Sequence, residues 1–279
     1  MRCRICDDKA TLWKDRGDLA LYRCARCAFV SGEPSHYVPA DERYGGYYRG
    51  PVPSAPEARY GEWLGRAEAA VGRGRLLEVG AGSGGLVRVA LARGWQVDAT
   101  EISESGLKML RETGATVFAG DVAAAHYPEG TFDLVVSLEV LEHLPVPVSH
   151  LRELWRITRK GGLLLLTTPN FNGLSRWLLG IRWRVIDPEH LGYFTPITLS
   201  RALYQAGYRR VHVRSRSLDV LSWRRGIYPA GGDGFDPQAS AQLRDTVETS
   251  KPLRIAKTGI NVILGIAGVG DSLLVWAQR

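Results

Sequence analysis

Apolar and polar residues alternate along residues 58–279 in a pattern that predicts strands and helices in turn. Short apolar runs typical of buried strands occur at RLLEVG, WQVDATEIS, ATVFAGDV, FDLVVSLEV and LLLLTTPN. Between these runs, apolar residues recur every three or four positions, as in GGLVRVALARG and ESGLKMLRETG, which is typical of amphipathic helices. The alternation predicts an α/β fold, with a doubly wound parallel sheet and helices on both faces.

The same patterns extend to the two ends of this region. Helical spacing predicts one helix from about residue 58 to 71, a second over residues 148–162 and a third over residues 198–208. RRVHVRSRS alternates like a strand, and DSLLVWAQR is predicted to close the chain as another. Between them we expect a Gly/Pro-rich loop around YPAGGDGFDP and a helical stretch that ends near residue 265.

All four cysteines fall within the first 27 residues, in the pattern C-x2-C, 17 residues, C-x2-C. They are Cys3, Cys6, Cys24 and Cys27. Two residues between cysteines let one tight turn aim both sulfurs at one ion, and the spacer is long enough for a hairpin. We expect a structural zinc ribbon, because four thiolates leave no open coordination position. Two disulfides are the competing interpretation, which the expected reducing compartment disfavours. Ala28 stands where many zinc ribbons have glycine.

Residues 35–57 are rich in Gly, Pro and Tyr and are predicted to form a linker or irregular arm. Its four tyrosines either cover a ligand or pack the arm against the next domain: Tyr37, Tyr44, Tyr47 and Tyr48. The expected organisation is therefore a zinc-ribbon segment over residues 1–34, a linker over 35–57 and one large domain over 58–279.

The composition, with 45% hydrophobic and 23% charged residues, is that of a soluble globular protein. A net charge of +7 permits RNA or a membrane surface as partner, although a solvated surface is the more common cause of a mild basic excess. The first ten residues are polar where a signal peptide needs apolar ones, and the apolar stretch near GINVILGIAGVG is too short to span a bilayer. We expect a cytoplasmic protein without a transmembrane segment, and a homodimer is left open.

The stretch LLEVGAGSGG suggests a cofactor site, because ligands of open α/β sheets bind beyond the carboxyl ends of the strands. Glu78, Gly80, Gly82 and Gly84 follow the first strand, the second strand ends at Glu101 and Asp121 follows the third. An acid at the end of the second strand suits hydrogen bonds to ribose hydroxyls.

The charge of this turn distinguishes two kinds of cofactor. Gly80, Gly82 and Gly85 also satisfy G-x-G-x-x-G, a weak signal for a dinucleotide. A pyrophosphate is disfavoured by the nearby carboxylate of Glu78, whereas S-adenosylmethionine carries no phosphate and is net cationic. Two charges about 4 Å apart at an effective dielectric of about 20 interact by a few kcal/mol, which is enough to reverse the preference. The sequence therefore favours S-adenosylmethionine.

Five stretches together resemble the class I S-adenosylmethionine-dependent methyltransferases: LLEVGAGSGG, ATEIS, AGDV, FDLVVSLEVLEHL and RKGGLLLLTTPN. The chain is most similar to the subgroup that modifies quinone precursors, sugars and other small molecules, some members of which carry an N-terminal zinc-binding segment. The resemblance implies a Rossmann-like, mostly parallel seven-stranded sheet in which DSLLVWAQR is antiparallel. It also implies these cofactor-binding residues: Glu78, Gly80, Gly82, Gly84, Glu101, Ile102, Asp121, Val122, Leu138 and Glu139.

Methyl transfer from a sulfonium is an in-line displacement, and a base is needed only if the acceptor must lose a proton. LEVLEHL holds Glu139, Glu142 and His143, and in the resembling subgroup this loop faces cofactor and acceptor. His190, in DPEHLGYFTP, is the second candidate catalytic residue. For His143 a local hydrogen-bonding role is also left open, as is a position of His190 away from both acceptor and cofactor.

The stretch NGLSRWLLGIRWRVI contains aromatic and basic residues that suit either an acceptor pocket or, for the tryptophans, the core. They are Trp177, Arg182, Trp183 and Arg184. The region before the helix over 198–208 is also partly structural, because Thr195 suits an N-cap and Pro196 the first helical position.

The most favoured function is methyl transfer to a small-molecule acceptor, most readily at oxygen. One rival is an RNA base methyltransferase that uses the zinc ribbon and a basic surface, although the place of an Asn/Asp-Pro-Pro-aromatic motif reads SLEVLEHL. Two further rivals are a dinucleotide-dependent oxidoreductase and a non-catalytic cofactor-binding module. Nucleic acid is thus an unfavoured partner, and a small-molecule acceptor is the expected one.

Overall fold

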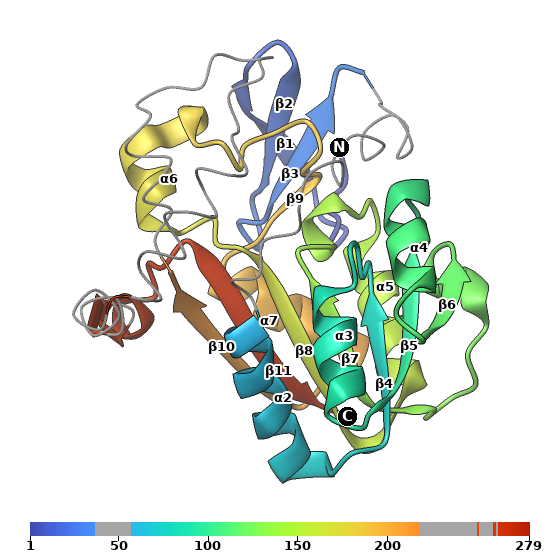
Figure 1. Cartoon of the computed structure of the whole chain (residues 1–279). Helices are drawn as coiled ribbons and strands as arrows, with labels where there is room; N and C mark the ends of the chain where they lie inside the picture. Colours follow the sequence, from blue (N-terminus) through green and yellow to red (C-terminus); the bar gives the residue numbers. More distant parts are fainter. Residues whose placement is uncertain (37–56, 218–249, 251–258, 261) are drawn as a thin grey trace.

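The computed structural model describes residues 1–36, 57–217, 250, 259–260 and 262–279 (Figure 1). Its larger sheet has seven strands in the order β10-β11-β8-β7-β4-β5-β6. Their bounds are β4 (Arg75–Val79), β5 (Gln96–Glu101), β6 (Thr116–Ala119), β7 (Phe132–Leu138), β8 (Thr158–Pro169), β10 (Arg210–Arg216) and β11 (Ser272–Gln278). Strands β4 to β8 are parallel, and β11 runs antiparallel between β8 and β10. The predicted doubly wound, mostly parallel sheet and its antiparallel closing strand are confirmed.

Helices cover both faces of this sheet because neighbouring strand residues point in opposite directions. The helices are α2 (Glu57–Val71), α3 (Gly85–Ala92), α4 (Glu104–Arg111), α5 (Pro147–Ile157), α6 (Leu174–Leu179) and α7 (Pro196–Ala206), with short 3-10 helices η1 (Val122–Ala125), η2 (Leu141–His143) and η3 (Gly180–Arg182). Leu76 belongs to the core that includes residues of α2, α3 and α4. Its neighbour Leu77 belongs to the opposite core, which includes residues of α5 and α7. In Figure 1, α2 and α3 lie in front of the sheet.

The helix expected over residues 148–162 is shorter than predicted. It ends at Ile157, and Thr158 has the extended backbone of a strand. The hydroxyl of Thr158 donates to the carbonyl of Leu154 at 2.6 Å, and Gly161 has a φ of 78°, which a right-handed helix does not allow. The prediction missed this boundary because it extended the helical pattern through Gly161 and Gly162, residues that favour a break.

A second sheet forms at the N-terminal end of the chain, in the order β1-β2-β3-β9, and all its pairs are antiparallel. Its strands are β1 (Ala10–Asp15), β2 (Leu19–Cys24), β3 (Val30–Pro34) and β9 (Gly192–Tyr193). The spacer between the cysteine pairs therefore forms the expected hairpin. The fourth strand comes from the large region of the chain, so hydrogen bonds join the N-terminal segment to it.

Three predictions concern residues outside the described ranges. One concerns the arm tyrosines, Tyr37, Tyr44, Tyr47 and Tyr48, and another the loop around YPAGGDGFDP. The third concerns the helical stretch after that loop, most of which precedes residue 259. Residues 262–267 are helical, in agreement with the helical stretch expected to end near residue 265. Within the described ranges, no helix combines the length and the apolar character needed to cross a bilayer.

Candidate functional site

A glycine turn at the end of β4 forms the floor of the first candidate site. The backbone N–H groups of Gly80 and Ala81 donate to the carbonyl of Thr100 on β5 at 2.9 and 3.0 Å. Gly80 has a φ of 66°, and a Cβ there would lie 2.6 Å from Cγ2 of Val140. Gly84, with a φ of 74°, is the N-cap of α3. Both conformation and close approach therefore require glycine at the turn.

Glu101 links the end of β5 to this turn. Its Oε2 accepts from the N–H of Gly82 at 2.7 Å, and its Oε1 accepts from the N–H groups of Ile102 and Ser103 at 2.9 and 2.8 Å. A carboxylate has about four lone-pair sites, so these three bonds leave room for about one hydroxyl donor. The predicted pair of ribose hydrogen bonds would need one of the backbone bonds to yield.

Glu78 is buried, with only 5% of its surface exposed. Burial raises the pKa of its carboxyl to about 8, and the charge of Glu101 adds to this, while the backbone of Val87 and the charge of Arg88 oppose it. At neutral pH the ligand-free carboxyl is therefore mostly protonated, which modifies the expectation of a carboxylate at this position. Its Oε2 is buried and lacks a hydrogen-bond partner within the described chain, so a cationic ligand group would find an acceptor here.

The other predicted cofactor residues surround the same strand ends. Ile102 is 49% exposed after β5, and Asp121 caps η1 by accepting from the N–H of Ala123 at 2.8 Å. The side chain of Val122 is fully buried in the core, so only its backbone can face a ligand. Leu138 is half-buried at the end of β7, and Glu139 is solvent-accessible with a φ of 55°. The topology thus gathers all ten predicted residues at one edge of the sheet.

Two histidines that the sequence suggested separately meet beside this edge. The ring centroids of His143 and His190 are 4.7 Å apart at an interplanar angle of 71°. The Nδ1 atom of His143 lies 3.0 Å from the carbonyl of Glu189, and that of His190 lies 2.7 Å from the carbonyl of Val185. Because a carbonyl only accepts, the Nδ1 atom of each ring donates to it.

Glu142, to which the sequence assigned no role, completes this group. A carboxylate oxygen of Glu142 and one ring nitrogen each of His143 and His190 all lie within 4.8 Å of one another. Glu142 is 2% exposed, and its Oε2 accepts from the hydroxyl of Thr168 at 2.9 Å. Burial and the neighbouring Glu139 raise the pKa of Glu142 well above its usual value. The sequence could have suggested Glu142, because this acid directly precedes His143. Its proximity to His190 could not be predicted, because no local sequence pattern relates the two residues.

The N-terminal sheet supports the segment that carries His190. The N–H of Leu191 donates to the carbonyl of Glu142 at 2.8 Å, and the N–H of Gly32 on β3 donates to the carbonyl of Leu191 at 3.0 Å. A Cβ at Gly32 would lie 2.6 Å from the carbonyl oxygen of His190. Phe29 and Phe194 pack with ring centroids 5.1 Å apart. The position of His190 is therefore set jointly by η2 and by the N-terminal segment.

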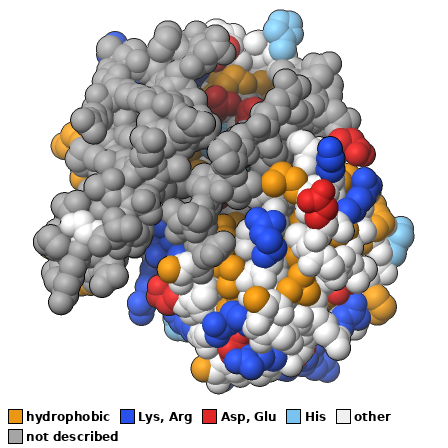
Figure 2. Space-filling view, viewed as in Figure 1, with side chains coloured by type: hydrophobic (Ala, Val, Ile, Leu, Met, Phe, Trp, Pro, Cys, Tyr) orange, Lys and Arg blue, Asp and Glu red, His pale blue; other side chains and the backbone are white. Residues whose placement is uncertain are grey.

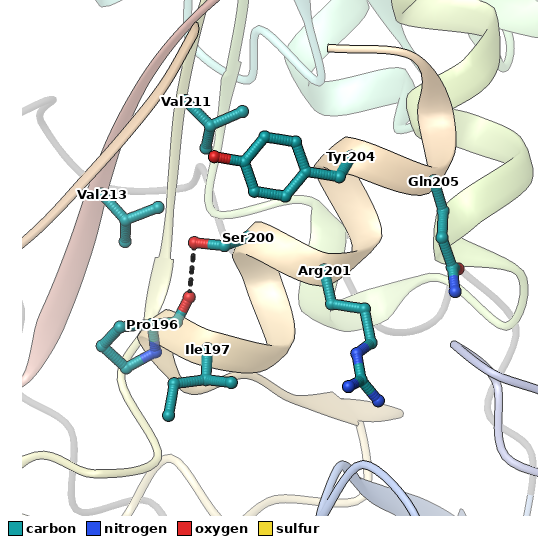
Figure 3. Close-up of a pocket in the computed structure, with 8 residues that line it drawn as sticks. All are labelled: Pro196, Ile197, Ser200, Arg201, Tyr204, Gln205, Val211 and Val213. Atoms are coloured by element: carbon teal, nitrogen blue, oxygen red, sulfur yellow. Dashed lines mark hydrogen bonds between the residues drawn. The ribbon is translucent and has the colours of Figure 1, made fainter. Parts of the chain in front are cut away.

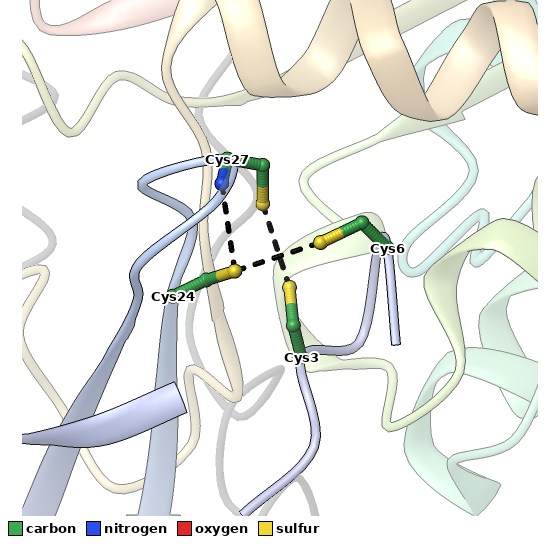
Figure 4. Close-up of side chains that lie close together, drawn as sticks. All are labelled: Cys3, Cys6, Cys24 and Cys27. Carbon is green, nitrogen blue, oxygen red and sulfur yellow. Dashed lines mark hydrogen bonds between the residues drawn. The ribbon is translucent and has the colours of Figure 1, made fainter. Parts of the chain in front are cut away.

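The four cysteines converge, as the spacing predicted (Figure 4). The sulfurs of Cys3 and Cys27, and those of Cys6 and Cys24, lie 3.5 Å apart, and none of the four forms a disulfide. Four sulfurs at about 2.3 Å from one zinc ion would be about 3.8 Å from each other, so the set fits a tetrahedral ion. Burial opposes ionisation of Cys24, but backbone and thiol hydrogen bonds outweigh it and lower its pKa to about 7. Ala28 has a φ of 61°, the conformation for which ribbons often use glycine.

The aromatic and basic residues of the 173–186 region separate into two environments. Trp183 is 1% exposed and packs in the core with residues of β2 and β9, which confirms the core interpretation for this residue. Trp177 is 73% exposed, and Arg182 and Arg184 are exposed as well. Of the two alternatives, Trp183 thus follows the core one, whereas Trp177 does not.

A shallow groove of about 740 Å³ lies elsewhere, between α7 and β10 (Figure 3). Its lining residues are Pro196, Ile197, Ser200, Arg201, Tyr204, Gln205, Val211 and Val213. None of the predicted site residues borders it, so its size does not make it the candidate active site. On the coloured part of the face in Figure 2, Lys and Arg side chains are scattered among acidic and hydrophobic ones, as for a solvated surface.

The strand order of the larger sheet is that of the Rossmann-like methyltransferases. A glycine turn after the first parallel strand and an acid at the end of the second are typical of the same class. The model of a methyltransferase domain family matches residues 55–213, and the chain belongs to this family. The relatives described next favour neither an RNA base methyltransferase nor an oxidoreductase.

Two curated relatives illustrate the similarity. The ubiquinone biosynthesis O-methyltransferase of Thiobacillus denitrificans is 30% identical over 164 residues, covering 53% of this chain and 70% of the relative. The malonyl-[acyl-carrier protein] O-methyltransferase of Serratia marcescens is 29% identical over 163 residues, covering 56% of this chain and 63% of the relative. The chain thus matches part of the length of each relative.

Solved structures share the fold. A methyltransferase dependent on S-adenosylmethionine from Archaeoglobus fulgidus has a TM-score of 0.57 at 17% identity, covering 85% of this chain and 98% of that one. Phosphoethanolamine N-methyltransferase 2 of Haemonchus contortus, in complex with S-adenosyl-L-methionine, has a TM-score of 0.52 at 15% identity, covering 90% and 62%. These likenesses concern the fold alone.

Proposed function

We propose that this chain transfers a methyl group from S-adenosylmethionine to an oxygen atom of a small-molecule acceptor. The observation that carries the proposal is the contiguity of the glycine turn with the two histidines. Val140 fills the space next to Gly80 and directly precedes η2, which carries His143. A cofactor in the turn and an acceptor at the imidazoles would therefore be neighbours. The names of the two curated relatives, both O-methyltransferases, support oxygen as the target.

The residues at the strand ends fit the cofactor chemically. The buried, unpartnered Oε2 of Glu78 suits a cationic amino-acid end, and Glu101 has acceptor capacity for a ribose hydroxyl. Ile102 and Leu138 offer apolar surface for the adenine, with the Asp121–Val122 turn and Glu139 at its rim. The bound cofactor supplies an electrophilic methyl carbon, and the protein contributes orientation of that carbon toward the acceptor.

The acceptor hydroxyl must lose its proton during or before transfer. We place this hydroxyl beside His143 and His190, which accept the proton. Their Nδ1 atoms donate to backbone carbonyls, which orients both rings. The half-buried position of both rings keeps the site accessible to a small molecule. Both histidines are therefore proposed catalytic residues.

We further propose that Cys3, Cys6, Cys24 and Cys27 bind a structural zinc ion. The fit of their sulfurs to a tetrahedron supports this assignment. The ion would stiffen the N-terminal segment whose β3 supports His190. The division into residues 1–34, 35–57 and 58–279 remains our proposal for the domain organisation.

The function is tested by incubating the full chain with S-adenosylmethionine and a panel of phenols, catechols and small carboxylic acids. We expect S-adenosylhomocysteine to accumulate together with a product heavier by one methylene group, both measured by mass spectrometry. His143→Gln and His190→Gln should lower kcat at least tenfold with cofactor affinity unchanged, because general acid–base groups contribute about 10²–10⁴-fold. His212→Gln, on exposed β10, is the matched control. Transfer to amines or RNA, with no oxygen product, would refute the proposal.

A further inference from the structure

One edge of the larger sheet is open along β10. Within the described part of the chain β10 pairs with β11 alone, so every second N–H and C=O group of β10 points outward from the sheet (Figure 1). The edge is closed at Ser215, because a Cβ at Gly265 would lie 3.4 Å from the carbonyl oxygen of Ser215. The open part therefore runs from Arg210 to Arg214, which is long enough for a short strand to pair with it.

The two faces of β10 carry different side chains. Arg210, His212 and Arg214 alternate along one face and are exposed. Val211 and Val213 point to the other face and are half-buried. The open edge therefore presents a basic row on one face and an apolar row on the other.

The apolar row continues into the groove between α7 and β10. Figure 3 shows Val211 and Val213 across from Tyr204 and Ser200 of α7. Tyr204 is 48% exposed, and Ile197, in the first turn of α7, is 73% exposed. Exposed apolar side chains that gather in this way mark a surface for a partner. Because the groove is shallow and borders an open strand, it suits the side chains of a polypeptide better than an enclosed small molecule.

The charge of this surface has one sign. Residues 196–216, which span α7 and β10, contain neither Asp nor Glu, and in the described ranges none of their arginines forms an ion pair with a carboxylate. These arginines are Arg201, Arg209, Arg210, Arg214 and Arg216. Two copies of β10 paired antiparallel would set arginines against one another, and like charges directly opposite destabilise a strand pair. The basic row thus disfavours a second copy of this chain and favours an acidic partner.

We propose that an acidic polypeptide binds this edge by adding a strand to β10. Its backbone pairs with the outward N–H and C=O groups of residues 210–214. Because alternate residues of a strand point to opposite faces, its acidic side chains lie beside Arg210 and Arg214, and its apolar side chains enter the groove beside Val211 and Val213. The surface is separate from the glycine turn and the two histidines, so the proposal does not depend on the proposed methyl transfer.

The probe is a short, fluorescently labelled peptide of alternating Glu and Val, titrated with the full chain at low ionic strength and followed by fluorescence anisotropy. We expect this Glu–Val peptide to bind. Peptides of alternating Lys and Val, or of alternating Glu and Ser, should bind at least tenfold more weakly, because each lacks either the acidic or the apolar row. Amide hydrogen exchange at residues 210–214 should slow in the complex. Binding without this protection would overturn strand addition.

Charge reversal on β10 tests the location. Arg210→Glu combined with Arg214→Glu should weaken binding of the Glu–Val peptide at least tenfold, and both side chains are exposed, so the fold should persist. The matched control is Lys108→Glu combined with Arg111→Glu on α4, which packs against β5 and β6 near the other edge of the sheet. It changes the net charge equally and should leave the affinity unchanged. An equal loss in both double variants would show attraction to net charge alone and would overturn the proposal.

Two other occupants of the edge would give distinct results. A dimer of the free chain in sedimentation velocity, dissociated by the double substitution on β10, would assign the edge to a second copy. Binding of single-stranded RNA that is lost in the same variant, with no peptide bound, would assign the basic row to nucleic acid. Either result would overturn the acidic polypeptide and would leave the proposed function standing, because neither experiment measures methyl transfer.

Discussion

The glycine turn after β4 and the histidine cluster beside it are assembled in different ways. The turn depends on a short stretch of chain, in which Gly80, Gly82 and Gly84 adopt positive φ values and Glu101 of the adjacent β5 accepts the N–H of Gly82. The cluster depends on η2, on the segment before β9 and, behind that segment, on β3. The comparison predicts that cofactor binding and methyl transfer can be disrupted separately. Changes in the N-terminal segment should impair methyl transfer while leaving the cofactor bound.

Removing one ligand of the proposed zinc ion should have the largest effect, because it should impair methyl transfer through the N-terminal segment. Cys24→Ser removes one thiolate, and the core shared by Cys24, Phe29 and Phe194 should loosen. We expect turnover to fall about 100-fold, because a displacement of about 1 Å at a reacting group can cost that much. Zinc content, turnover and cofactor affinity would be measured together, with Lys14→Ala on exposed β1 as control. A zinc-free chain with full turnover would show that the two regions are not coupled.

Glu101→Ala should weaken cofactor binding at the glycine turn. The change removes three hydrogen bonds to backbone N–H groups, and each bond to a charged group contributes about 1.5–3 kcal/mol. We expect the Kd for S-adenosylmethionine to rise about 10- to 100-fold, measured by isothermal titration calorimetry. The exposed Glu104→Ala, three residues along, is the matched control. Unchanged affinity would mean that Glu101 does not contribute to the cofactor site.

Gly32→Ala should test whether methyl transfer can be impaired without loss of cofactor binding, because the change should displace His190 and not the glycine turn. The new Cβ would meet the carbonyl oxygen of His190 at 2.6 Å, and overpacking of this kind costs about 1–3 kcal/mol. We expect kcat to fall about tenfold while cofactor affinity stays unchanged. Gly61→Ala in α2, where an added Cβ meets no atom within 4 Å, should leave kcat unaltered. An equal loss of cofactor affinity in Gly32→Ala would contradict the separation.

The smallest expected effect concerns His150, which lies in α5 outside both regions. Burial lowers its pKa from 6.5 to about 4, with the charges of Asp121 and Glu153 opposing the shift. The unfolded chain therefore binds a proton that the folded chain excludes, so stability is lost as pH falls from about 6.5 to about 4. At about 1.4 kcal/mol per pKa unit, the full loss is about 3 kcal/mol below pH 4.

His150→Leu should flatten this part of the pH profile. Urea unfolding at pH 7 and pH 4.5 would measure it, with His126→Asn as an exposed control that tolerates the left-handed backbone at residue 126. If the slope between these two pH values is the same with and without His150, another group titrates there.

The sequence by itself determined the class of fold, because burial on both faces of a parallel strand demands apolar runs such as LLEV and FDLVVSL. It also determined the four-cysteine cluster and the glycine turn, since both depend on residues close together in the chain or on a fixed spacing. It did not locate the end of α5 at Ile157, where a helical pattern runs into a strand.

Tertiary structure alone decided that Glu142 and His190 would meet, that β9 would complete the N-terminal sheet and that Glu78 would be buried. The physical reason is that periodicity reports which face of an element is buried. The proximity of residues 142 and 190 follows instead from the hydrogen bond between Leu191 and Glu142 and from the pairing of β9 with β3, and no local spacing encodes that arrangement.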